Sequence, residues 1–170
     1  PGINGSGLSF AVAGSAQAQG PYQFSLTNAM TLEGWIYLRR QTGGYQGLAS
    51  GNGCCNYRLM VSPTMHPYYN PGERRDRPVN GFTFNTNQWY HFAMTIDQGN
   101  ITIYVDGNVV DTGVRDAGPA LPDQKDVFLL GAGESPGLYV PDGIVDEVAI
   151  FDKALDQNTI QNHIKNPGKF

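Results

Sequence analysis

Apolar and polar residues alternate in short segments along most of the chain, and turn-forming residues separate these segments. In residues 31–38, Leu32, Ile36 and Leu38 fall on one face of an extended strand, while the intervening residues fall on the other. Residues 89–96 repeat this pattern with apolar side chains at every second position. A period of two is typical of half-buried β-strands, so both segments are predicted to be strands.

Turn and cap signals divide the remaining chain. Asp97–Asn100 is predicted to form a tight turn, and Asp106-Gly107 predicts a hairpin. A short helix is predicted from Gln157 to Ile164, with Asp156 as its N-cap and residues 166–168 ending it. Further strands are predicted at residues 8–12, 22–26, 46–50, 57–62, 80–84, 101–105, 127–130 and 144–151, with a return strand starting at Val109. Many strands with one terminal helix predict an all-β sandwich.

The composition narrows the class of protein. A length of 170 residues suits one domain over residues 1–170, and 15% charged residues is below the roughly 25% of average domains. Together with many turn-forming and aromatic residues, this favours an extracellular or cell-surface domain. Because the chain starts without Met or a signal sequence, we expect it to be excised from a larger protein. The net charge of −4 argues against nucleic acid as a partner, and the lack of a long apolar run argues against membrane insertion.

Residues 63–78 contain four prolines and show no strand pattern, so they are predicted to form a long loop. Loops of this length are usually functional or disordered. This one carries Tyr68, Tyr69 and three of the seven arginines, including Arg74 and Arg77. It is therefore a local basic region on an acidic protein.

Three stretches occur in a recognisable order: MTLEGWIY at residues 30–37, WYHFAMT through IYVDG at residues 89–107, and GIVDEVAIFDKAL at residues 143–155. The ordered set resembles the laminin G-like members of the concanavalin A-like lectin/glucanase superfamily. The resemblance implies a jelly-roll sandwich of two antiparallel sheets with one short C-terminal helix. It does not fix the function, because the superfamily includes lectins, carbohydrate-binding modules, adhesion domains and glycoside hydrolases.

Glycoside hydrolysis with retention needs two carboxylates about 5–5.5 Å apart. Residues two or four positions apart on one strand face could supply them. The four glutamates, Glu33, Glu73, Glu134 and Glu147, are all farther apart in the sequence. Asp146 and Glu147 are neighbours, which a regular strand points to opposite faces. We therefore predict that the chain is not an enzyme.

Asp146 is predicted to share a strand face with Ile144, Val148 and Ile150, where a carboxylate needs hydrogen bonds or a cation. One interpretation is that it accepts backbone N–H groups from the N-terminal segment or a loop. The other is a structural calcium site, since relatives often use the matching aspartate as a calcium ligand. Because residues 8–22 contain no acid, such a site would depend on neutral oxygens and be weaker.

Cys54 and Cys55 are the only cysteines, and they are adjacent. They are free thiols, a bridge between two chains, or a vicinal disulfide. Adjacent Cα atoms lie closer than the usual 4.4–6.8 Å of a disulfide, so a vicinal bridge is strained and easily reduced. We favour the vicinal disulfide, whose compact ring offers an apolar surface on which a sugar could stack.

The sequence predicts a non-catalytic, lectin-type carbohydrate-binding module with a shallow site built from loops. An apolar platform beside planar hydrogen-bonding groups suits sugars, and the arginines favour an anionic or sulfated glycan. The alternatives are a protein-binding adhesion module and a spacer domain without a ligand. The predicted contact residues are Cys54, Cys55, Asn56, Tyr57 and Arg58, followed by Tyr68, Tyr69, Arg74 and Arg77.

Overall fold

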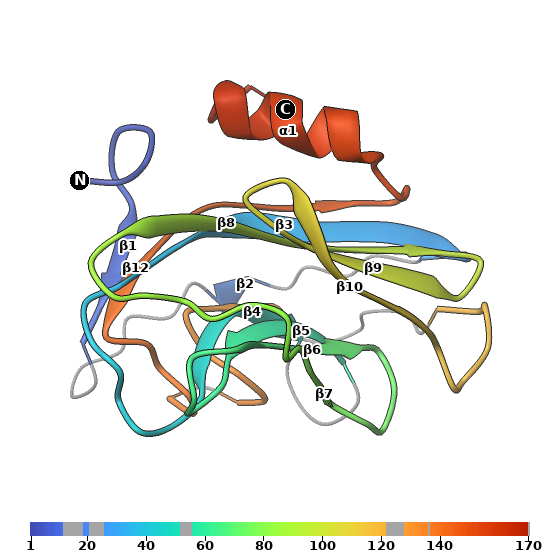
Figure 1. Ribbon diagram of the computed structural model, residues 1–170, viewed down its shortest axis with the longest axis horizontal. Helices are drawn as coiled ribbons and strands as arrows, with labels where there is room; N and C mark the ends of the chain where they lie inside the picture. The colour runs from blue at the N-terminus through green and yellow to red at the C-terminus, as the bar shows by residue number, and fades with distance from the viewer. Residues whose placement is uncertain (12–18, 21–25, 52–55, 122–127, 136, 170) are drawn as a thin grey trace.

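Two antiparallel six-stranded sheets face each other, and one short helix covers the outer side of the first sheet (Figure 1). The computed structural model describes residues 1–11, 19–20, 26–51, 56–121, 128–135 and 137–169. The first sheet has the order β1-β12-β3-β8-β9-β10, and the second has the order β2-β11-β4-β5-β6-β7. The elements are β1 Leu8–Phe10, β2 Gln19–Gly20, β3 Ala29–Leu38, β4 Gln46–Gly51, β5 Tyr57–Val61, β6 Pro67–Pro71, β7 Arg77–Pro78, β8 Trp89–Asp97, β9 Asn100–Val105, β10 Asn108–Val114, β11 Phe128–Leu130, β12 Gly143–Phe151 and α1 Gln157–Lys165. The predicted fold class is confirmed.

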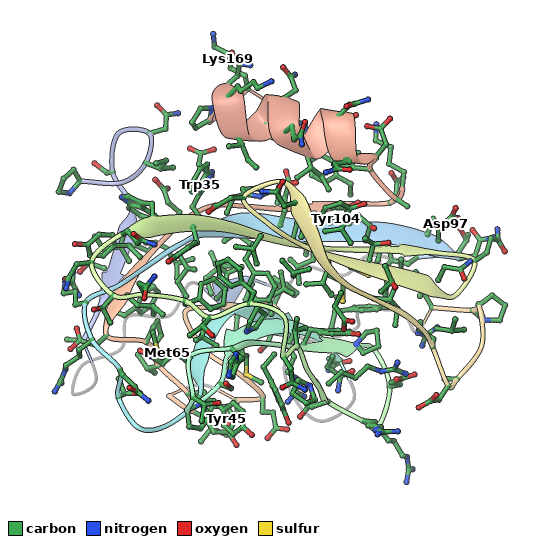
Figure 2. All side chains as sticks on the ribbon, viewed as in Figure 1. Trp35, Tyr45, Met65, Asp97, Tyr104 and Lys169 are labelled. Carbon is green, nitrogen blue, oxygen red and sulfur yellow. The ribbon has the colours of Figure 1, made fainter. Side chains whose placement is uncertain are left out.

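The core lies between the sheets, where side chains fill the space (Figure 2). Strand β3 contributes Leu32, Ile36 and Leu38, the three residues that the alternation places on one face. Strand β8 contributes alternate residues in the same way, and β5 faces them with Tyr57 and Leu59. Burial of one face fixes the register of each strand, because a slip by one residue would turn the apolar side chains to the outside.

Both predicted turns have the expected backbone. Gln98 and Gly99 have φ angles of 49° and 83°, and Asp106 and Gly107 have φ angles of 49° and 73°. Two consecutive positive φ angles are the mark of a type I′ turn, whose twist matches that of the strands it joins. The β8–β9–β10 meander is therefore encoded locally.

The segment from residue 63 to 84 differs from its prediction. The proline-rich part, predicted to be a loop, contains β6 and β7, whereas residues 80–84, predicted to be a strand, are irregular. Pro67 and Pro71 stand at the two ends of β6, and Pro78 belongs to the edge strand β7, where a missing N–H is tolerated. The predicted strand at residues 22–26 falls largely outside the described residues.

A bulge in β12 corrects the predicted face of Asp146. Asp146 pairs with Trp35 and Ala149 with Glu33, so two residues of β12 lie opposite Gly34. The bulge contains Glu147, with a φ of 47°. The extra residue reverses the alternation: Val148 and Ile150 pack against the core, whereas Asp146 lies on the outer face with Ile144.

The helix is capped as predicted and ends one residue later. The Asp156 side chain accepts a hydrogen bond of 2.7 Å from Thr159 N, and Ile160 packs against Ala93 and Tyr104 on the outer face of the first sheet. The predicted all-β sandwich therefore gains a second, smaller apolar layer under α1. No helix in the described part of the chain has the length and hydropathy needed to cross a bilayer.

Candidate functional site

The segment between β6 and β7 is held in a defined shape by side chains. Asn70 Oδ1 accepts hydrogen bonds of 2.9 Å from both Gly72 N and Glu73 N. This pattern of an asparagine bonding to the next two or three amides stabilises a tight turn. Asn70 Nδ2 also donates to Asp76 Oδ1 at 2.8 Å. One buried side chain thus fixes both ends of the turn.

Glu73 and Arg115 connect this turn to the first sheet. Glu73 is only 6% exposed; it accepts from Arg77 Nε at 3.0 Å and from Asp116 N at 2.9 Å. Arg115, at the end of β10, donates to Gly72 O at 3.0 Å. Because charge-assisted hydrogen bonds are stronger than neutral ones, these contacts hold the edge of the second sheet against the edge of the first.

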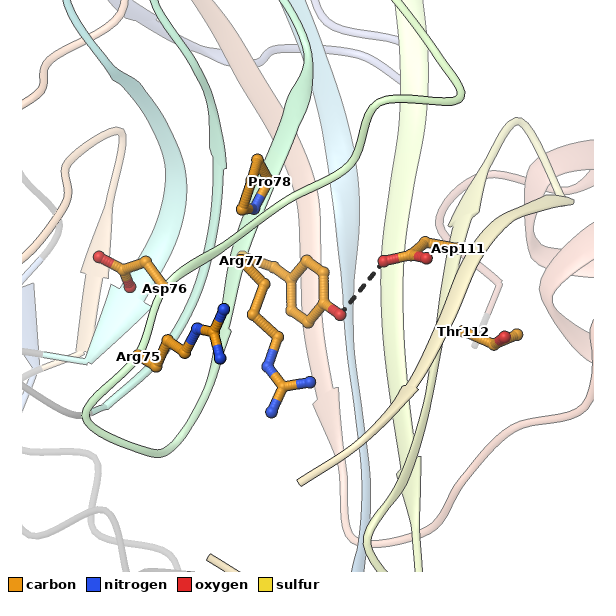
Figure 3. A pocket seen from close by; sticks show the side chains of 7 residues that line it. Arg75, Asp76, Arg77, Pro78, Asp111 and Thr112 are labelled. Atoms are coloured by element: carbon orange, nitrogen blue, oxygen red, sulfur yellow. Dashed lines mark hydrogen bonds between the residues drawn. The ribbon is translucent and has the colours of Figure 1, made fainter. Parts of the chain in front are cut away.

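A cleft of about 320 Å³ opens where the two edges meet (Figure 3). Its volume is at the lower end of the range for small-ligand sites. At one side of the cleft, the Tyr69 hydroxyl donates a hydrogen bond of 3.3 Å to Asp111 Oδ2. The lining residues come from β6, the β6–β7 turn, β7 and β10: Tyr69, Arg75, Asp76, Arg77, Pro78, Asp111 and Thr112.

The cleft presents unused hydrogen-bonding groups. The Arg75 guanidinium, Asp111 Oδ1 and the Thr112 hydroxyl have no hydrogen-bond partner within the described residues. Arg75 and Thr112 are exposed, and Asp111 is half-buried. Burial raises the pKa of Tyr69 to about 12, with the Asp111 charge acting in the same direction. The Tyr69 phenol therefore stays protonated and keeps its donor role at neutral pH.

A second group of predicted residues lies on the outer face of the second sheet. Arg58 is 1% exposed, and its Nη1 lies 2.7 Å from Glu134 Oε1 and 3.6 Å from Asp76 Oδ2. The Tyr68 ring centroid lies 4.7 Å from that of Tyr45. Burial raises the pKa of Tyr68, and the neighbouring Tyr45 adds to the shift.

The other predicted contact residues are dispersed. Tyr57 points into the core and is 1% exposed, Asn56 is half-buried immediately before β5, and Arg74 is exposed outside the cleft lining. Cys54 and Cys55 lie outside the described residues. The structure thus places Tyr69 and Arg77 in the cleft and Arg58 and Tyr68 on the adjoining sheet face.

The comparisons place this fold in a family. A laminin G-type family model, described as the concanavalin A-like lectin/glucanases superfamily, matches residues 11–161. The chain belongs to this superfamily. No curated protein matches this lectin/glucanase-type domain.

Solved structures share the fold of the lectin/glucanase-type domain at low sequence identity. A candidate carbohydrate-binding protein from Bacteroides ovatus has a TM-score of 0.69 and 20% identity over 86% of this chain and 44% of its own. Domain 4 of AbnA, a GH43 extracellular arabinanase from Geobacillus stearothermophilus solved with arabinotriose, has a TM-score of 0.63 and 16% identity over 92% and 86%. Botulinum neurotoxin type C, whose cell entry depends on two ganglioside molecules, has a TM-score of 0.61 and 18% identity over 83% and 36%. The chain spans less than half of the Bacteroides ovatus protein.

Sequence reasoning missed most of the cleft. Asp111 and Thr112 lie in the return strand of a hairpin, and no sequence pattern indicates which sheet edge they approach. Arg75 and Asp76 lie inside the proline-rich segment that the sequence singled out by its composition. For Arg75 and Asp76, that unusual composition is the one signal in the sequence that points to a functional site.

Asp146 has the hydrogen bonds that its structural interpretation requires. Its Oδ2 accepts from Ile3 N at 2.9 Å and Asn4 N at 3.4 Å, and its Oδ1 accepts from Glu147 N at 3.0 Å. Within the described residues, no group of three or more His, Cys, Asp or Glu side chains could hold a metal ion. Calcium binding at Asp146 stays a prediction.

Proposed function

We propose that this domain is a non-catalytic carbohydrate-binding module of a secreted or cell-surface protein, and that the cleft between β7 and β10 holds the sugar. The observation that carries the proposal is the set of unused groups in the cleft: the Arg75 guanidinium, Asp111 Oδ1 and the Thr112 hydroxyl. Sugar hydroxyls both donate and accept, so they suit a mixture of cationic donors, carboxylate acceptors and a hydroxyl.

The balance of charge bears on the class of glycan. The cleft lining contains two arginines and two aspartates, and Arg77 is already paired with Glu73 and with Asp116 at 3.3 Å. A sulfate or carboxylate would meet nearby carboxylates there, and repulsion between like charges is costly. These groups favour a neutral sugar over the anionic glycan expected from the arginines. An array that carries both classes separates the two.

The positions of the glutamates support a non-catalytic role. Glu33 lies buried beneath α1 against His163, and Glu73 is occupied by Arg77 and backbone amides. Glu134 is paired with Arg58, and the Glu147 carboxylate faces Asn4. Each of the four glutamates has its own partner in a different part of the fold, unlike the facing pair that glycoside hydrolysis requires.

The relatives support the proposal at the level of class. The Bacteroides ovatus protein is a candidate carbohydrate binder, the arabinanase domain was solved with a trisaccharide and comes from an extracellular enzyme, and the neurotoxin interacts with gangliosides. Because these proteins share at most 20% identity with this chain, their ligands do not identify the sugar bound here. They motivate a search across glycans outside or on the surface of cells.

The test is binding of the purified domain to an array of neutral and acidic glycans and polysaccharides, followed by calorimetry with the best binder. Arg75→Ala is expected to weaken binding at least about tenfold, since it removes a charge-assisted hydrogen bond. Arg74→Ala is the matched control, because Arg74 is an exposed neighbour outside the cleft lining. Equal losses in both variants would indicate unspecific attraction to positive charge.

An array without any binder, probed with a folded sample, would contradict the proposal. The protein-binding adhesion module and the spacer domain would then be the better accounts. A protein partner would be indicated by a protein that binds the domain without any sugar and binds the Arg75→Ala variant more weakly.

A further inference from the structure

Three tyrosines form a cluster on the outer face of the second sheet, on the side away from α1, where Figure 2 shows Tyr45. The ring centroids of Tyr45 and Tyr68 lie 4.7 Å apart, and those of Tyr45 and Tyr139 lie 5.3 Å apart. All three tyrosines are half-buried. Tyr45 precedes β4, Tyr68 belongs to β6, and Tyr139 lies between β11 and β12.

Within this tyrosine cluster, Tyr139 is held in place by its backbone and by close packing of its ring. Gly47 N donates to Tyr139 O at 2.7 Å, which ties the β11–β12 connection to β4. A Cβ on Gly133 would lie 2.6 Å from Met60 Sδ and 2.7 Å from Tyr139 Cδ2, so a glycine is needed for this close packing. Tyr139 has a φ of 58°, an unfavourable conformation for a bulky residue. Such local strain persists where the surrounding structure fixes the residue.

The tyrosine cluster is continuous with the cleft. Pro78 lines the cleft and is the register partner of Tyr68, so their Cβ atoms are separated by about 5 Å. Asp76 also lines the cleft, and its carboxylate lies 3.6 Å from Arg58 Nη1 on the tyrosine side. Exposed and half-buried groups therefore lead from the cleft across the edge strand to the tyrosine cluster.

On the basis of the proposed function, we infer that the cleft and the tyrosine cluster are two subsites for one glycan chain. The cleft holds one sugar unit by hydrogen bonds, and the following units lie with their C–H faces on the rings of Tyr68, Tyr45 and Tyr139. Aromatic rings are apolar on their faces and rigid, so they give contact area at a small entropic cost. The ligand class is thus an oligosaccharide or an internal stretch of polysaccharide, with several units bound at once.

The first test needs only the wild-type domain. Fragments of one to six sugar units, cut from the polysaccharide that binds best on the array, are titrated by calorimetry. The affinity is expected to rise at least about tenfold between the single sugar and the longer fragments, because the added units gain contact area on the tyrosine rings. The same affinity for all lengths would overturn the inference while leaving the cleft as a site for one sugar. A lack of binding at every length would instead contradict the proposed function.

The second test separates the two subsites. Tyr45→Ala and Tyr139→Ala are expected to remove the gain from longer fragments and to leave the affinity for the single sugar unchanged. Tyr37→Ala is the matched control, because Tyr37 is a half-buried tyrosine in an aromatic pair with Trp89 on the other sheet. Variants that stay folded and keep the full length dependence would show that the cluster only packs the β11–β12 connection, which overturns the inference. The titration of the wild-type domain with fragments of increasing length tests the inference even where a variant fails to fold.

Discussion

Tyr69 and Asp111 are joined across the gap between the two sheets: the Tyr69 hydroxyl donates to Asp111 Oδ2 at 3.3 Å. Tyr69 belongs to β6 in the second sheet, and Asp111 belongs to β10 at the edge of the first. The bond holds Asp111 Oδ2 in place. Because both oxygens belong to one carboxylate, the position of Oδ1 is restricted as well. An acceptor held in place before a ligand arrives binds with a smaller loss of entropy. The contact thus links the packing of the sheets to the chemistry of the cleft.

Tyr69→Phe is expected to lower the free energy of unfolding by about 1 kcal/mol, the usual net value of one hydrogen bond. The ring stays in the core, so the loss reports the hydroxyl alone. The same variant is expected to weaken glycan binding, because Asp111 loses the group that orients it. Urea unfolding and calorimetry measure the two effects. Unchanged stability together with unchanged binding would show that this contact holds neither the sheets nor the site.

The bulge opposite Gly34 gives a prediction on stability. A Cβ at Gly34 would lie 2.8 Å from Val148 Cγ2 and 3.2 Å from Val148 Cα, which is part of the backbone. Gly34→Ala is therefore expected to destabilise the fold by about 1–3 kcal/mol through overpacking. In Gly44→Ala the new methyl group meets only Thr42 Oγ1, at 4.0 Å, and a change within about 0.5 kcal/mol is expected. Similar unfolding midpoints for the two variants would contradict the packing seen at the bulge.

Glu33, His91 and His163 form a buried polar cluster between the first sheet and α1. His163 Nδ1 shares a hydrogen bond of 2.6 Å with Glu33 Oε1, and His91 Nε2 lies 3.8 Å from Glu33 Oε2. His91 is buried, and its Nδ1 has no hydrogen-bond partner within the described residues. Burial lowers the pKa of His91 to about 3, and His163 adds to this, whereas burial raises the pKa of Glu33.

The lowered pKa of His91 predicts a loss of stability in acid. The unfolded chain binds a proton at this histidine below about pH 6.5, while the folded chain excludes it down to about pH 3. The contribution of the neutral His91 to the free energy of unfolding is thus fully present above pH 6.5 and is lost as the pH falls toward 3. Between pH 7.5 and 4.5, the wild type should lose roughly 2–3 kcal/mol more than His91→Gln in urea unfolding.

The comparison with His91→Gln removes contributions that both proteins share. The raised pKa of Glu33 acts in the opposite direction, because its protonated form is favoured in the folded state. Parallel pH curves for the two proteins would contradict a neutral, buried His91.

Cys54 and Cys55 give a prediction that depends on the sequence alone. If they form the vicinal disulfide, alkylation without reductant adds no label to the intact mass, and alkylation after mild reduction adds two. Strain in a bridge between adjacent residues makes it easy to reduce. Two labels without reductant would leave both cysteines as free thiols, and a doubled mass would indicate a bridge between chains.

The sheets could be predicted from the sequence because one buried face dictates their pattern. Leu32, Ile36 and Leu38 reach the core as the alternation predicts, and Asp106-Gly107 forms the expected hairpin. The bulge at Glu147 could not be read in the same way. One extra residue leaves the local composition unchanged but turns every later side chain of the strand to the opposite face. The prediction that Asp146 shares a strand face with Val148 and Ile150 was therefore wrong.

The candidate site could be predicted only in part. Tyr69 and Arg77 were singled out by their unusual segment, and both line the cleft. Asp111 and Thr112 lie more than thirty positions further along the chain, and they approach the cleft because two sheet edges meet. Local sequence carries no signal for which edges meet. The tyrosine cluster was missed for the same reason, because Tyr45 and Tyr139 come from two distant connecting segments.

The measurement that tests the central claim most directly is a titration of the isotope-labelled domain with a sugar fragment from the best array binder, followed through its backbone amide NMR signals. The account predicts that the largest shifts occur at Arg75, Asp76, Asp111 and Thr112, and that Tyr68 responds when the fragment is long. Shifts confined to residues 54–58, or to the face beneath α1, with none at the cleft, would contradict it.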